Sequence, residues 1–348
     1  MDQVQLGKTG LRVSPIGFGG IPIQRLSEEE AVAVVRGCLD LGVTFIDTAH
    51  GYTVSEDRIG KAIAGRRQGL VLATKTPARD AATAQEHIEL SLQRLGVEWI
   101  DIYQLHGVSS HDKLEAVLAP GGALEALQAA RDRGQIGHLG FSSHSLEVAQ
   151  KAIRTGMFET VQFPLNFIAT EAADELLPLA REYGLGFIAM KSMGGGLLAR
   201  ADLAFKYLLQ FPDVVPDPGI ERVEEMAEIV ALVEEGGDLS SADWVAIEAI
   251  RQELGTRFCH RCNYCQPCPQ DIPISAVLTY RSVWKRMPPE RTLSEGWQQN
   301  MDRAATCQEC GECEERCPYE LPIHELLKEN IAFFQSELAR YRAQSTLP

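Results

Sequence analysis

Eight short apolar runs, each followed by an amphipathic segment, recur through the first two thirds of this 348-residue chain. The runs are rich in β-branched residues and continuously apolar, which is typical of strands covered on both faces. Eight such repeats favour a closed (β/α)8 TIM barrel, an α/β fold. The expected strands are 16–20, 43–49, 70–76, 100–106, 136–143, 160–166, 186–193 and 214–219. The expected helices are 27–41, 55–64, 83–95, 121–133, 145–155, 170–183, 201–211, 221–235 and 240–254.

An open dinucleotide-binding sheet is the alternative arrangement of these elements. Its Gly-x-Gly-x-x-Gly signal is missing, because Gly17-Phe18-Gly19 continues with Gly20, Ile21 and Pro22. Before the first strand, residues 3–6 and 11–13 flank a Gly-Lys-Thr-Gly turn, which predicts a small hairpin at the bottom of the barrel.

Cysteine and charge divide the chain at the same place. Eight of the nine cysteines lie between Cys259 and Cys317. Residues 255–348 hold 11 basic and 12 acidic residues, so nearly all of the net charge of −15 precedes them. We therefore predict a barrel domain over residues 1–254 and a second domain over residues 255–348.

Charge and hydropathy also restrict the partners. The acidic balance argues against nucleic acid. No apolar stretch is long enough for a membrane span, and the first residues show no basic-then-apolar leader. We expect no membrane partner and a cytoplasmic location.

Polar side chains stand at the ends of three expected strands. These are Asp47, Lys75 and His106, and Tyr52 follows Asp47 in the next loop. Barrel enzymes work at the carboxyl ends of their strands. For any single residue, ordinary solvation of a strand end is the alternative interpretation. The set of four predicts one pocket.

The segments FIDTAHGY, LATK and YQLH resemble the aldo-keto reductase family, and the resemblance covers residues 1 to about 250. The order Asp, Tyr, Lys, His and the gaps of 5, 23 and 31 residues match that family. The resemblance implies an NAD(P)H-dependent oxidoreductase that reduces a small aldehyde or ketone. It implies that Tyr52 acts as general acid, that Lys75 and Asp47 tune it, and that His106 orients the carbonyl.

The same resemblance implies a nicotinamide site on the later strands. Implied cofactor-binding residues are Ser142, Ser143, Gln162, Asn166, Lys191, Gly219, Arg222 and Glu228. Ser143 replaces the usual Asn, and Ile229 replaces the usual Asn after Glu228. Arg222 favours the 2′-phosphate of NADP, whereas Glu221 opposes it. NADP and NAD both stay open.

Two cysteine runs fill the second domain. The first is C-x2-C-x2-C-x2-C-P and ends at Pro269; the second is C-x2-C-x2-C-x3-C-P and ends at Pro318. The second fits the bacterial ferredoxin run, in which the fourth cysteine of each run ligates the other cluster. We predict two 4Fe–4S clusters, with zinc as the alternative. The predicted ligand sets are Cys259, Cys262 and Cys265 with Cys317, and Cys307, Cys310 and Cys313 with Cys268.

The sequence after each run repeats as well. Residues 268–278 parallel residues 317–327, with Pro273 and Pro322 placed to begin a helix. The residues between the runs have helical patterns without strand alternation. The domain therefore resembles an all-α ferredoxin, as in a group of aldo-keto reductases that carry such a module.

Two function classes follow. In the first, the clusters of a carbonyl reductase exchange electrons with an external ferredoxin or other redox protein. In the second, a non-catalytic nicotinamide-binding sensor or electron-transfer protein carries structural or oxygen-sensing clusters. The four-residue set favours the first class.

Overall fold

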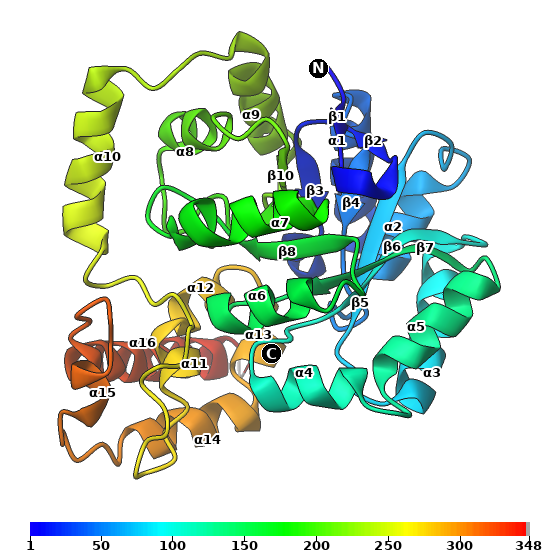
Figure 1. Ribbon diagram of the computed structural model, residues 1–348. Helices are drawn as coiled ribbons and strands as arrows, with labels where there is room; N and C mark the ends of the chain where they lie inside the picture. The colour runs from blue at the N-terminus through cyan, green and yellow to red at the C-terminus, as the bar shows by residue number, and fades with distance from the viewer. Residues whose placement is uncertain (346–348) are drawn as a thin grey trace. The chain divides into compact units, whose positions relative to one another are not determined.

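The structure is a computed structural model that describes residues 1–345 (Figure 1). It divides into two compact units, one over residues 1–243 and a second that begins at Trp244. The helix 240–254, which we assigned to the barrel, lies at the start of the second unit. The domain boundary at residue 254 stays a prediction.

Eight parallel strands form the sheet of the first unit, in the order of the sequence. The strands are β3 (Gly17–Gly19), β4 (Phe45–Asp47), β5 (Val71–Thr76), β6 (Ile100–Leu105), β7 (Ile136–Ser142), β8 (Thr160–Pro164), β9 (Gly186–Met190) and β10 (Val214–Pro216). All eight predicted strands are present, and the TIM-barrel prediction is confirmed.

Two main-chain hydrogen bonds bring the last strand back to the first. Gly19 N–H donates to Pro218 O at 2.8 Å, and Ile220 N–H donates to Gly19 O at 3.4 Å. A Cβ at Gly19 would lie 2.6 Å from Asp217 O, so only glycine permits this close approach. The closure of the barrel keeps the carboxyl ends of all eight strands around one rim.

Helices cover the outside of the sheet (Figure 1). They are α1 (Glu28–Asp40), α2 (Ser55–Ile63), α3 (Ala81–Leu95), α4 (His111–Leu118), α5 (Ala123–Asp132), α6 (Leu146–Arg154), α7 (Leu177–Tyr183), α8 (Ala201–Leu208) and α9 (Val223–Glu235), with short 3₁₀ helices at Gly7–Thr9 and Pro22–Arg25. The pattern did not predict α4, whose first turn is capped by the Ser110 hydroxyl. A π-helical turn, Ala172–Leu176, precedes α7, because Pro178 has no N–H for an α-helical bond to Asp174.

The predicted N-terminal hairpin is present as the antiparallel pair β1 (Val4–Gln5) and β2 (Arg12–Val13). Leu6 and Val13 are fully buried and pack with Phe45 and Val71, the first residues of β4 and β5. The hairpin thus contacts the amino ends of the strands, opposite the rim that carries the polar residues.

Among its described residues, the second unit contains helices and loops and no strand. Its helices are α10 (Ser241–Leu254), α11 (Ile274–Leu278), α12 (Tyr280–Trp284), α13 (Pro289–Thr292), α14 (Glu295–Ala304), α15 (Glu312–Glu315) and α16 (Ile323–Ser345). Tyr280 is at its core, where its ring meets Trp297 at 4.9 Å and its hydroxyl donates to Thr292 O at 3.1 Å. Between residues 1 and 345, no helix is both long enough and apolar enough to cross a bilayer.

Both predicted helix starts of the repeat are confirmed. Pro273 directly precedes α11, and Pro322 directly precedes α16. The repeat in the sequence is therefore a repeat in structure: a cysteine run, a turn and a helix.

Gly60 in α2 lies against the end of α3. A Cβ there would overlap the main-chain carbonyl of Arg94 and lie 2.8 Å from Leu95 O. Helix propensity alone predicts that Gly→Ala stabilises a helix by about 1 kcal/mol. We instead expect Gly60→Ala to lower the free energy of unfolding of the barrel by about 1–3 kcal/mol, because main chain cannot move aside. Denaturant unfolding followed by circular dichroism measures it.

Gly296 in α14 is the matched control, since no atom lies within 4 Å of its Cβ position. Gly296→Ala should be neutral or stabilising. A Gly60→Ala variant as stable as the parent protein would show that α2 and α3 are not so closely packed.

Candidate active site and cysteine cavity

Polar side chains gather at the carboxyl rim of the barrel. Asp47 is the last residue of β4, and Lys75 is next to last in β5. Lys75 lies opposite Gln104 of β6 in the register, and Gln162 lies in β8. All four side chains are buried, so their charges and amides must satisfy one another.

Lys75 and Asp47 form a buried ion pair. The Lys75 Nζ lies 2.5 Å from Asp47 Oδ2 and also donates to Thr48 O at 2.7 Å. Their side chains are only 2% and 3% exposed. Burial opposes the ammonium charge, but Asp47, helped by Tyr52 and Asp217, outweighs it and raises the pKa of Lys75 above its ordinary value. Lys75 is therefore a permanent cation at neutral pH.

Tyr52 and His106 lie next to this pair, half-buried. The Lys75 Nζ is 5.2 Å from the centre of the Tyr52 ring. The Tyr52 and His106 rings meet edge to face at 5.8 Å. Arg79 donates to His106 O at 2.7 Å, which holds the loop that follows β6. The structure thus brings the four predicted residues together: Asp47 and Lys75 are buried, and Tyr52 and His106 are partly exposed.

Asp217 lies beside the four predicted residues, and the sequence patterns did not single it out. It follows β10 directly and is buried. The Gln162 Nε2 donates to Asp217 Oδ2 at 2.5 Å and to Asp47 Oδ2 at 3.1 Å. Burial and the Asp47 charge raise the pKa of Asp217 well above its ordinary value, and Lys75 only partly opposes them. Its signal in the sequence was an aspartate directly after an apolar run, as at Asp47.

Three of the implied cofactor-binding side chains form hydrogen bonds with main-chain groups. The Ser142 hydroxyl accepts from Gly107 N–H at 2.9 Å. The Ser143 hydroxyl accepts from Ser145 N–H at 3.1 Å. Asn166 donates to Lys191 O at 3.0 Å and accepts from two N–H groups of its own loop. These contacts position the loops after β7, β8 and β9.

Unsatisfied buried atoms mark where a ligand fits. Within residues 1–345, Gln162 Oε1, Ser192 Oγ and Asp217 Oδ1 are buried without a hydrogen-bond partner. Gln162 lies within β8, whereas Ser192 and Asp217 follow the ends of β9 and β10. A buried polar atom without a partner costs free energy, and an amide-bearing ligand would satisfy it. The residues present therefore fit a nicotinamide.

The start of α9 holds the remaining implied cofactor residues. Gly219 precedes it, Arg222 is its N-cap residue, and Glu228 lies within it. The Arg222 Nε lies 3.1 Å from Glu225 Oε1, and Arg25 lies 3.4 Å from Glu221. Both cations are thus paired with carboxylates at the place where an adenosine phosphate is implied.

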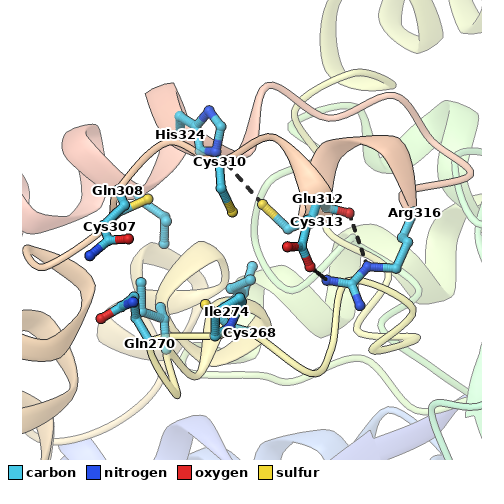
Figure 2. Close-up of a pocket in the computed structure, with 13 residues that line it drawn as sticks. Cys268, Gln270, Ile274, Cys307, Gln308, Cys310, Glu312, Cys313, Arg316 and His324 are labelled. Carbon is cyan, nitrogen blue, oxygen red and sulfur yellow. Dashed lines mark hydrogen bonds and ion pairs between the residues drawn. The ribbon is translucent and has the colours of Figure 1, made fainter.

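A cavity of about 200 Å³ in the second unit joins the two cysteine runs. Cys307, Cys310 and Cys313 line it together with Cys268 of the first run (Figure 2). These four are one of the two predicted ligand sets. The cavity places sulfur from both runs around one hollow, as a cluster shared between runs requires.

Burial and neighbouring groups also affect the cysteine thiols. Burial, with Cys259 and Cys262 nearby, raises the pKa of Cys265 to about 12. In the second run, burial and the neighbouring Glu314 raise the pKa of Cys313 to about 11. A bound metal would favour the thiolate form of these cysteines, because cysteine ligands bind as thiolates. In the part of the chain that is described, no group of three or more His, Cys, Asp or Glu side chains is arranged to hold a single metal ion. A cubane cluster needs sulfurs around a hollow, which the cavity provides.

Comparisons with known proteins agree with this organisation. Residues 15–204 match the Aldo/keto reductase family, and residues 258–322 match the 4Fe-4S dicluster domain. Aldo-keto reductase YhdN of Bacillus subtilis (strain 168) is 31% identical in an alignment 217 residues long that covers 57% of this chain and 64% of that protein. L-galactose dehydrogenase of Arabidopsis thaliana is 30% identical over 56% of this chain and 66% of its own length. The chain thus spans somewhat less than two thirds of these relatives.

A solved structure shares the barrel. The holo form of aldo-keto reductase AKR11C1 from Bacillus halodurans superposes with a TM-score of 0.64 and 25% identity, over 72% of this chain and 96% of that one. The aldo/keto reductase family model matches more than half of the chain, and the barrel and the order of its strands agree with it. The chain belongs to the aldo/keto reductase family of oxidoreductases and carries a C-terminal 4Fe-4S dicluster domain.

Proposed function

We propose that the chain reduces an aldehyde or ketone with hydride from NAD(P)H at the carboxyl rim of its barrel. The observation that carries this proposal is the buried Lys75–Asp47 pair directly beside Tyr52. A fixed cation next to a phenol, with an imidazole at 5.8 Å, is suited to acid catalysis at a carbonyl oxygen.

Each side chain has one part in the proposed reaction. His106 donates a hydrogen bond that orients the carbonyl oxygen toward Tyr52. Tyr52 gives its hydroxyl proton to that oxygen as general acid. Lys75 stabilises the phenolate that Tyr52 becomes, and Asp47 keeps Lys75 charged and in place.

When bound, the nicotinamide supplies the hydride. We assign its carboxamide to Gln162, whose Oε1 has no partner among the described residues, and to Ser142 in the adjacent strand. Ser143, Asn166 and Lys191 shape the surrounding loops in this proposal. Gly219, Arg222 and Glu228 would bind the adenosine end.

The second domain, residues 255–348 in our assignment, would hold two 4Fe–4S clusters. We propose that they exchange single electrons with an external ferredoxin or other redox protein. A cytoplasmic location fits this role, because thiols stay reduced there and can take up iron.

Tyr52→Phe removes the proposed general acid and keeps the ring. We expect kcat for carbonyl reduction to fall by about 10²–10⁴-fold, while the Kd for NADPH measured by fluorescence stays unchanged. Steady-state assays with a panel of aldehydes and ketones under anaerobic conditions measure the loss.

Tyr183→Phe is the matched control, since Tyr183 is exposed at the end of α7. It should retain the parent rate. Equal activity of Tyr52→Phe and the parent enzyme would refute the role of Tyr52. Tight cofactor binding with no reduction of any carbonyl by the parent protein would instead favour the sensor.

Asp217→Asn tests the second buried acid. An unfolded Asp has a pKa of about 4. Because burial and Asp47 raise the pKa of Asp217 in the folded protein, the folded state keeps a proton that the unfolded state has lost. The parent protein therefore loses stability as the pH rises between the two pKa values, by up to about 1.4 kcal/mol per pH unit. Asn keeps the neutral shape without titrating.

We expect the Tm of Asp217→Asn, relative to the parent Tm, to increase steadily between about pH 5 and 8. Thermal unfolding at a series of pH values measures this difference. A difference that stays constant over that range would mean that folding does not raise the pKa of Asp217, because the folded and unfolded states would then bind the same number of protons there.

A further inference from the structure

The two halves of the cysteine domain repeat in sequence, which allows one position to be compared between them. The segment from Cys317 to His324 aligns with the segment from Cys268 to Ser275, seven residues after the last cysteine of each run. His324 is the second residue of α16, and Ser275 is the second residue of α11. The same structural position therefore carries different side chains.

In the second half, this side chain contacts a predicted cluster ligand. The His324 Nε2 lies 3.8 Å from Cys313 Sγ, and Figure 2 shows the contact at the edge of the cavity. The Glu314 carboxylate accepts the main-chain N–H of His324 at 3.0 Å and lies 3.4 Å from its Nδ1. A thiolate bound to iron carries no proton, so the imidazole N–H is the donor.

In the first half, the equivalent side chain is committed elsewhere. The Ser275 hydroxyl donates to Asn263 Oδ1 at 2.6 Å. A serine hydroxyl has one proton to donate, so this bond leaves none for a sulfur. The first cluster lacks the hydrogen bond that the second receives from this position.

Acidic residues favour the first cluster, because the second run holds Glu309, Glu312, Glu314 and Glu315 whereas the first run holds none. Ion pairs offset part of this charge, and Glu309 lies 2.6 Å from Lys328. Arg316 and Glu312 both line the cavity, and their side chains lie 3.4 Å apart, so their opposite charges largely offset each other. Solvent acts in the same direction as His324. Cys310 is exposed, whereas its counterpart Cys262 in the first run is only partly exposed. Water stabilises the added charge of a reduced cluster.

We propose that His324 makes the two clusters unequal, so that the first electron entering the domain resides on the cluster of Cys307, Cys310, Cys313 and Cys268. This inference rests on the proposed two-cluster assignment. Reduction adds one negative charge to a cluster, and a donor at a ligand sulfur stabilises the reduced form more than the oxidised form. His324 is only 17% exposed, so water weakens this hydrogen bond little.

Potentiometric titration of the anaerobically purified full chain tests the proposal. Dithionite supplies the electrons, and electron paramagnetic resonance follows each cluster. The parent protein should show two separate midpoint potentials. In His324→Ser, which installs the residue of the first half, the higher potential should fall by the equivalent of about a tenfold change in the ratio of reduced to oxidised cluster, about 59 mV. The lower potential should stay unchanged.

Two further variants make the result specific. Ser275→Ala alters the equivalent position without touching a sulfur, and it should leave both potentials in place. His324→Gln keeps an N–H donor and should retain part of the separation, even if His324→Ser fails to assemble its cluster. Unchanged potentials in both His324 variants, or equal shifts of both clusters, would overturn the inference.

Iron and acid-labile sulfide analysis of the parent protein separates this outcome from failure of the proposed function. Two clusters per chain with potentials insensitive to His324 would contradict only the inference. A content of iron and sulfide below two clusters would contradict the assignment on which it rests.

Discussion

The buried ion pair of Lys75 and Asp47 determines what the rim of the barrel can do. Two charges with side chains almost completely excluded from water are tolerated only because each satisfies the other. Removing one partner from such a pair typically costs about 3–5 kcal/mol, because the other charge stays buried alone. The pair exists only where β4 and β5 end side by side, so the site depends on the pairing of these two strands.

The same constraint explains the second acid. One ammonium neutralises one carboxylate, and Asp217 shares Gln162 with Asp47. With Asp217 protonated, the buried group is neutral as a whole, and its one positive charge lies next to Tyr52. The Gln162 Oε1, which has no hydrogen-bond partner, belongs to the same network. A bound amide that donates to this oxygen would therefore be linked through Gln162 to Asp47 and Asp217.

In the proposed function, the two domains would handle electrons in different numbers. A hydride carries two electrons together, whereas each 4Fe–4S cluster accepts one. Two clusters together can hold as many electrons as one hydride. Clusters of unequal potential would take these electrons in a fixed order, which suits a partner that accepts them singly. This relation gives the difference between His324 and Ser275 a functional meaning.

The strands and the four-residue set were predictable because they depend on local signals. A covered parallel strand must be continuously apolar, and a polar residue at its end stands out, as Asp47 and Lys75 do. Asp217 gave the same signal, but its partner Gln162 is 55 residues away and its burial depends on barrel closure. The α4 helix has only 8 residues, too few to stand out as an apolar repeat, and Ser110 caps its first turn. The contact of His324 with Cys313 required the path of the chain between them, which spacing does not specify.

Replacing the ion pair as a unit tests the central claim most directly. Asp47→Asn combined with Lys75→Met removes both charges together, so no buried charge is left without a partner. The measurement is the single-turnover rate of NADPH oxidation with a carbonyl substrate, beside the NADPH Kd and the Tm. We predict a folded protein that binds NADPH but reduces the carbonyl at least about 10²-fold more slowly than the parent. A rate within a few-fold of the parent would contradict the account, because the pair would then serve only to hold the fold.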